Sequence, residues 1–116
     1  MNKELIINTY ELDTLLFKEN LLGTFKNNIL KYENENDSFI IDLANKTFYK
    51  ENLESILILT ATHATLTLKE LNKSFQINLK KHNFKVKENL ITIEYCLESM
   101  DNPLKITIEM SDTNEI

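Results

Sequence analysis

Apolar and polar residues alternate with a period of two along most of the second half of the chain. Ile91, Ile93 and Tyr95, for example, are separated by polar residues. Such alternation is typical of β-strands that have one face on a core and one in water. The segments with this pattern are 64–70, 74–80, 84–87, 91–98 and 104–110. The intervals between them hold no crossover helix, so we expect antiparallel pairing, with turns at 72–73, 82–83, 88–89 and 101–103.

The middle of the chain is more apolar. Residues 39–43 predict one strand, and the run Ile56-Leu57-Ile58-Leu59 predicts another. The second run is apolar on both of its faces. It is therefore either a strand covered on its outer side or part of a subunit interface, with Leu57 and Leu59 as the candidate contact residues.

The first third of the chain allows two interpretations. Residues 5–12 predict a strand, and Leu30 and Tyr32 begin another that ends in the polar stretch 33–37. Residues 14–22 form either a short helix, with Asp13 as N-cap and Gly23 just past its end, or a hairpin that turns at 18–20. At the other end of the chain, we expect residues 111–116 to fray.

The tetrapeptide Lys-Glu-Asn-Leu occurs three times, at 18–21, 50–53 and 87–90. Each copy lies between apolar segments. A three-residue hairpin loop often ends on a left-handed residue, and Asn accepts that conformation more readily than most residues other than Gly. The repeat therefore predicts three similar turns with Asn20, Asn52 and Asn89 in the left-handed position, and it favours the hairpin interpretation of 14–22.

These elements predict an all-β protein of one domain, residues 1–116. About eight to ten short strands joined by short turns are typical of a closed barrel or a two-sheet sandwich. Sequential hairpins favour a small antiparallel up-and-down barrel, because closure leaves no exposed strand edge. The alternative is a β-sandwich, with one short N-terminal helix if 14–22 is helical.

Composition indicates an ordinary soluble protein. The chain has 116 residues, of which 42% are hydrophobic and 27% charged. No apolar run approaches the roughly 20 residues of a membrane helix, and the first residues lack the basic region of a signal peptide. The single Cys96 allows no internal disulfide. We therefore expect a cytoplasmic protein without a membrane partner.

The charge argues against a nucleic-acid partner. The net charge is −5, and the chain contains neither Arg nor Trp. Arg supplies most bidentate contacts to bases and phosphates, and Trp is a common platform for stacking bases. A lysine cluster at 80, 81, 85 and 87 is interpreted as a device that keeps a hairpin unpaired with other chains, or else as a dock for an anionic partner.

No motif for catalysis, metal binding or cofactor binding is present. His63 and His82 stand apart from other ligands at metal-site spacing, and both are interpreted as surface residues. Cys96 shares its strand face with Glu94 and Glu98, whose carboxylates disfavour a thiolate. Gly-rich phosphate loops and nucleophile elbows are missing. The sequence therefore predicts no catalytic residue, no metal and no cofactor, and a protein that is not an enzyme.

Aromatic residues are the remaining candidates for a site. In a barrel, inward tyrosines and phenylalanines line a pocket with a few polar groups, or else form a packed core. The candidate lining residues are Tyr32, Phe39, Phe75, Phe84 and Tyr95.

Four short segments resemble a known family. They are Gly23-Thr24-Phe25-Lys26, Leu30-Lys31-Tyr32-Glu33, the stretch 91–97 and Leu104-Lys105-Ile106-Thr107-Ile108. The first two resemble the early strands, and the last two the final strands, of the YwiB-like proteins, small bacterial proteins of unknown function. The resemblance implies a calycin-type, lipocalin-like barrel and supplies no active-site residue.

Three functional hypotheses follow. The first is a non-enzymatic cytoplasmic binding module for a small apolar ligand in the barrel or for a partner protein. The second is a structural or interaction protein that forms a homodimer through the apolar strand 56–59. The third is a small acidic inhibitor or phage accessory protein, since compact acidic domains can mimic nucleic acid.

Overall fold

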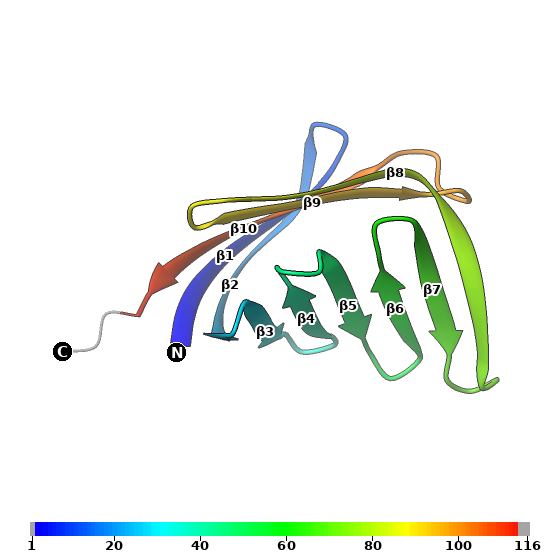
Figure 1. The fold of residues 1–116 in the computed structure, drawn as a ribbon, viewed down its shortest axis with the longest axis horizontal. Helices are drawn as coiled ribbons and strands as arrows, with labels where there is room; N and C mark the ends of the chain where they lie inside the picture. The colour runs from blue at the N-terminus through cyan, green and yellow to red at the C-terminus, as the bar shows by residue number, and fades with distance from the viewer. Residues whose placement is uncertain (1, 114–116) are drawn as a thin grey trace.

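The computed structural model describes residues 2–113, which form ten β-strands and no helix (Figure 1). The strands are β1 (Asn2–Glu11), β2 (Thr14–Lys26), β3 (Ile29–Glu33), β4 (Ser38–Asp42), β5 (Thr47–Glu51), β6 (Ser55–Leu59), β7 (His63–Leu68), β8 (Lys73–Lys87), β9 (Leu90–Leu97) and β10 (Leu104–Asp112). Each strand pairs antiparallel with its sequence neighbours, and β1 pairs with β10. The predicted up-and-down barrel is confirmed, and it is closed.

The barrel has two kinds of wall. Figure 1 shows the short strands β3 to β7 side by side in one wall, while the longer strands β8, β9, β10, β1 and β2 cross beside them. Strand β8 belongs to both walls: residues 73–78 pair with β7, and residues 79–87 pair with β9. A register shift between Leu79 and Lys81 lies where the strand passes from one partner to the other.

The core follows from the strand registers. Successive pairings place one row of inward residues across seven strands: Phe25, Leu30, Ile41, Phe48, Leu59, Ala64 and Ile77. The five members of this row on β3 to β7 are at most 1% exposed. Complete burial of one such large apolar side chain contributes about 1.5–3 kcal/mol, so this row is a principal source of stability.

Gly23 lets β2 pack closely against both of its neighbours. A Cβ atom at this position would lie 2.8 Å from Cδ1 of Leu5 and 2.9 Å from the carbonyl oxygen of Lys31. Real Cβ atoms do not approach other atoms so closely, and the Lys31 oxygen belongs to the backbone. The one glycine of the chain thus stands where any side chain would push β1 and β3 away.

The repeated tetrapeptide does not mark one kind of turn, and this prediction is wrong. Residues 14–22 are neither helix nor hairpin, because the first copy lies inside β2 and the chain turns earlier, at Leu12 and Asp13. The residues with positive φ in the described part are Leu12, Asn27, Asn28, Lys46, Asn72 and Glu88. None of Asn20, Asn52 and Asn89 is among them. In the third copy it is Glu88, at φ 54°, that makes the turn.

Other boundaries also differ from the expectations. The predicted turn at 82–83 lies inside β8, which continues to Lys87. Strand β5 was not expected, because its sequence mixes charged and aromatic residues. Strand β10 extends to Asp112, so residues 111 and 112 are paired with β1 and are not frayed. Residues 114–116 lie outside the described range.

Candidate functional site

A cavity of about 420 Å³ opens at the end of the barrel where β1, β3, β5 and β9 finish. Its lining comes from those strands, from the first residues of β2, β4 and β10, and from the β3–β4 turn. The volume falls within the range of small-molecule sites, about 300–1,000 Å³. The barrel interior is therefore packed along one row and hollow at this end.

Aromatic side chains form one wall of the cavity. Tyr32 and Phe39 are direct partners across β3 and β4, and their rings stack with centroids 4.6 Å apart. Phe48 follows on β5, with its ring 5.9 Å from that of Phe39 and tilted by 45°. These side chains present a continuous apolar surface to anything bound.

A β-bulge shapes the rim of the cavity. In the pairing of β1 with β2, Thr9 lies opposite Phe17 and Tyr10 lies opposite Leu15, so Leu16 is an extra residue. A bulge interrupts the strict alternation of side chains between the two faces. Leu16 and Phe17, although adjacent in sequence, both line the cavity. Both side chains are also exposed, and together they form an apolar lip at the opening of the cavity.

An acidic group is fixed at the same rim. The Nδ2 amide of Asn34 donates to the carboxylate of Glu19, at 3.1 Å from Oε2 and 3.5 Å from Oε1. Oδ1 of Asn34 in turn accepts the backbone N–H groups of Asn36 and Asp37, at 3.0 and 2.9 Å. One asparagine therefore closes the β3–β4 turn and holds the Glu19 side chain against it.

Two buried tyrosines bring hydroxyl groups to the cavity. Tyr32 is 6% exposed and Tyr95 is 7% exposed. Burial raises the pKa of the Tyr32 hydroxyl, and the nearby Glu19 carboxylate raises it further. Burial likewise raises the pKa of Tyr95. Within residues 2–113 neither hydroxyl hydrogen-bonds to the protein, and no fully buried polar side-chain atom there lacks a partner. Both hydroxyls are therefore neutral donors that reach open space.

Lys50 carries the one charge in the second inward row of the barrel. This row consists of Gly23, Tyr32, Phe39, Lys50, Leu57, Leu66 and Phe75. The Nζ atom of Lys50 lies 5.9 Å from the centre of the Phe39 ring, and the side chain lines the cavity. The ion pairs in the described part of the chain are Lys3–Asp112, Lys69–Glu51 and Lys81–Glu94. Lys50 takes part in none of them.

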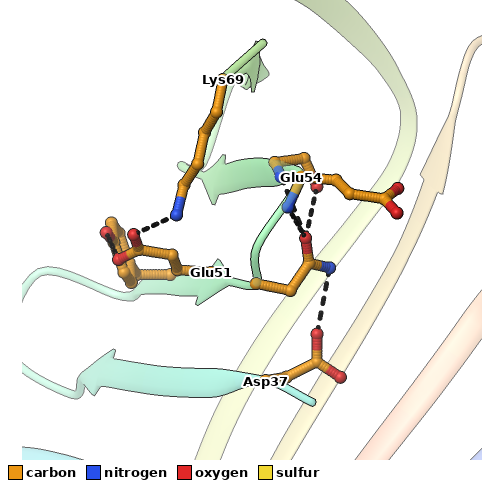
Figure 2. Close-up of polar contacts among 7 residues, drawn as sticks. Asp37, Glu51, Glu54 and Lys69 are labelled. Carbon is orange, nitrogen blue, oxygen red and sulfur yellow. Dashed lines mark hydrogen bonds and ion pairs between the residues drawn. The ribbon is translucent and has the colours of Figure 1, made fainter.

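A polar network supports the turns beside the cavity (Figure 2). The Nδ2 amide of Asn52 donates to Asp37 at 3.1 Å, which joins the β5–β6 turn to the β3–β4 turn. On the outer face, Glu51 accepts from the Tyr49 hydroxyl at 2.6 Å and from Lys69 at 2.7 Å. The Lys69 ammonium and the Tyr49 hydroxyl lower the pKa of the Glu51 carboxyl.

Three of the five predicted lining residues meet at the cavity: Tyr32, Phe39 and Tyr95. Phe84 is buried in the core away from the lining, and Phe75, 45% exposed on β8, also lies outside it. Sequence reasoning missed Glu19 and Lys50, because both fall in the repeated tetrapeptide that was interpreted as a turn. Lys50 could have been found from its spacing in the sequence. It follows Phe48 by two residues, so both side chains lie on the same face of β5.

The predicted interface residues Leu57 and Leu59 lie on the inner face of β6. Leu59 is fully buried in the core row, and Leu57 packs against the core from the inner face of β6. Leu59 is therefore enclosed by its own barrel, whereas Leu57 is half-buried, and the interface at these two residues stays a prediction. The outward positions of the same strand belong to Ile56 and Ile58, which are half-buried.

The remaining candidate groups do not form a site. Cys96 is buried on the outer phase of β9, with Sγ 3.7 Å from the carbonyl oxygens of Leu97 and Met100. His82 lies beside Tyr95, and burial together with Lys46 lowers its pKa. Residues 2–113 contain no cluster of three or more groups able to hold a metal ion.

No protein-family model, curated protein or solved structure matches the chain. In the described range no helix has the length and apolar character needed to cross a membrane. The cavity and its lining are therefore the features that bear on function.

Proposed function

We propose that the protein is a non-enzymatic binding module that takes a small, largely apolar molecule into the cavity at the end of its barrel. The observation that carries the proposal is the aromatic wall of Tyr32, Phe39 and Phe48 beside the hydroxyls of two buried tyrosines, which reach open space and have no protein partner in the described range. An apolar surface with a few convergent polar groups is the usual composition of a small-molecule site.

The contrast between the two inward rows supports this proposal. The row through Phe48 and Leu59 is closely packed and stabilises the fold, and Phe48 is its one member that also borders the cavity. The cavity begins at the next row, where Lys50 and the tyrosines introduce polar atoms. A packed core gains nothing from an unpaired charge or from unpaired hydroxyls, because desolvation makes such groups costly unless a partner satisfies them.

The same proposal includes a cytoplasmic location and membership of the calycin-type YwiB-like proteins. Its support is the four short sequence segments together with the closed antiparallel barrel.

Binding of a neutral fluorescent probe tests the proposal. N-phenyl-1-naphthylamine should bind the wild-type protein at one site with micromolar affinity. Thr9→Trp places a large ring in the cavity from β1, so it should weaken binding at least ten-fold. Asn8→Trp is the matched control, since Asn8 precedes Thr9 on the opposite face of the same strand.

Native mass spectrometry of freshly purified protein complements the probe. A mass excess that disappears on denaturation identifies a bound molecule directly. Failure of the wild-type protein to bind the probe, or equal binding by the Thr9→Trp and Asn8→Trp variants, would overturn the proposal. Circular dichroism of each variant establishes that the barrel is intact.

A further inference from the structure

The ligand's chemical class follows from the charges in the cavity, if the cavity is the binding site proposed above. We infer that the ligand is a monoanionic amphiphile, a carboxylate on an apolar body, and that Lys50 binds its carboxylate. The inference rests on the proposed function and adds the identity of the group that is recognised.

The position of Lys50 is the first argument. Its side chain lies on the inner face of β5, between Phe39 and Leu57 in the pairing register. The aliphatic stem runs along apolar neighbours, and Nζ lies over the Phe39 ring at 5.9 Å. A cation–π contact uses none of the three hydrogen-bond donors of the ammonium group. A ligand carboxylate accepts hydrogen bonds from these donors.

The acidic residues of the lining do not neutralise Lys50. The Glu19 carboxylate accepts the Nδ2 amide of Asn34 through both of its oxygens. Asp37 accepts the Asn52 amide and is thereby turned toward the β5–β6 turn. Both carboxylates thus have polar partners in the protein, whereas the ammonium group has none among the described residues.

The hydroxyls of Tyr32 and Tyr95 add hydrogen-bond donors for the ligand carboxylate. Tyr32 lies on β3 in the same inward row as Lys50, with Phe39 between them. Tyr95 lines the cavity from β9, in the other wall. A neutral phenol donates one hydrogen bond, and a carboxylate has about four acceptor positions. The apolar body of the ligand then lies against Phe39, Phe48 and Ile106, and its outer end meets the lip of Leu16 and Phe17.

Three ligands of equal chain length distinguish the contribution of the ligand's charge to affinity from that of its apolar body. Decanoate, decan-1-ol and decylamine are used to displace N-phenyl-1-naphthylamine from the wild-type protein. Decanoate should bind about ten-fold more tightly than decan-1-ol, because a hydrogen bond to a charged group contributes more than one between neutral groups. Decylamine should bind more weakly than either. Naphthalene-2-carboxylate, run in parallel, tells whether the carboxylate is carried by a chain or by a ring.

Lys50→Met removes the charge and keeps the length of the stem. It should weaken decanoate binding about ten-fold more than it weakens the binding of decan-1-ol or of the probe. Lys50→Arg should restore most of the preference for decanoate. Lys31→Met is the matched control, because Lys31 lies on the exposed outer face of adjacent strand β3 and should alter no affinity.

The outcomes distinguish this inference from the proposed function. If the probe and decan-1-ol bind but decanoate binds no more tightly than decan-1-ol, the inference of a carboxylate ligand is wrong and the proposed function stands. If decylamine binds most tightly and Glu19→Gln abolishes its binding, the site selects a cation and the inference is overturned. If no ligand and no probe binds the wild-type protein, the proposed function fails and the inference fails with it. The wild-type series decides between these outcomes even if the Lys50→Met variant does not fold.

Discussion

Single residues acquire their roles in this protein from the face of the strand on which they lie. Glu51 follows Lys50 directly, yet it points outward and pairs with Lys69, while Lys50 faces the cavity without an acidic partner in the described range. The two residues are adjacent in sequence, and only the strand phase separates a surface ion pair from a candidate binding group. The same rule places Tyr32 inside and its neighbour Lys31 outside.

Buried tyrosines make the stability of the protein sensitive to alkaline pH. Burial raises the pKa of Tyr32 and Tyr95 above the ordinary value of 10.0. In the unfolded chain both hydroxyls lose their protons near pH 10, whereas in the barrel they keep them. Unfolding therefore becomes easier as pH rises above 10, and each tyrosine reduces the free energy of unfolding by up to about 1.4 kcal/mol per pH unit.

Urea denaturation at pH 8.5 and pH 11 measures this loss. The double variant Tyr32→Phe, Tyr95→Phe should lose less stability between the two pH values than the wild-type protein. All other ionisable groups are common to both proteins, so their contributions cancel in the difference. An equal loss in the two proteins would show that the folded barrel does not raise the pKa of these hydroxyls.

At the level of elements, the turns beside the cavity depend on side chains more than on backbone conformation. Asn52 accepts the backbone N–H groups of Glu54 and Ser55, both at 2.9 Å, and donates to Asp37. Asn34 closes the β3–β4 turn in the same way and also holds Glu19. Both turns form without a left-handed residue, which explains why a rule based on backbone conformation did not describe them.

Asn52→Ala should reduce the free energy of unfolding by about 1–2 kcal/mol, because it removes four hydrogen bonds and leaves two turn N–H groups without that acceptor. Leu53→Ala is the control in the same turn. Leu53 is 93% exposed, so its loss should change stability by less than about 0.5 kcal/mol. Urea denaturation monitored by circular dichroism measures both. Equal effects of the two substitutions would contradict the role assigned to Asn52.

The sequence predicted the fold well and the site only in part, for a physical reason. Period-two alternation reports burial on one face, and it is clear wherever that face is apolar, as in β9 and β10. It fails where an inward position carries a charge, as in β5 with Lys50, because a polar residue there resembles the outward face. It also fails at Leu16, where the bulge depends on pairing with β1, and pairing between distant residues leaves no local pattern.

At the scale of the whole molecule, closure of the barrel and integrity of the cavity depend on the same strands. The β1–β10 ladder joins the first and last strands through nine residue pairs, from Lys3 with Asp112 to Glu11 with Leu104. Ile7 and Thr9 on one side of this ladder and Leu104 and Ile106 on the other all line the cavity. Separation of β1 from β10 would therefore open the proposed site as well as the barrel.

Hydrogen exchange followed by mass spectrometry tests whether the ladder is as durable as the rest of the barrel. In a sandwich, β1 or β10 would be an edge strand, and edge amides exchange through local opening. In a closed barrel both strands have two partners, so peptides from 2–11 and 104–112 should exchange within about ten-fold of the rate of 90–97. The turn residues 98–103 serve as a fast-exchanging control. Exchange in 2–11 that is orders of magnitude faster than in 90–97 would mean that the barrel opens at this ladder in solution. The cavity would then be a transient feature, and ligand binding would have to slow that exchange.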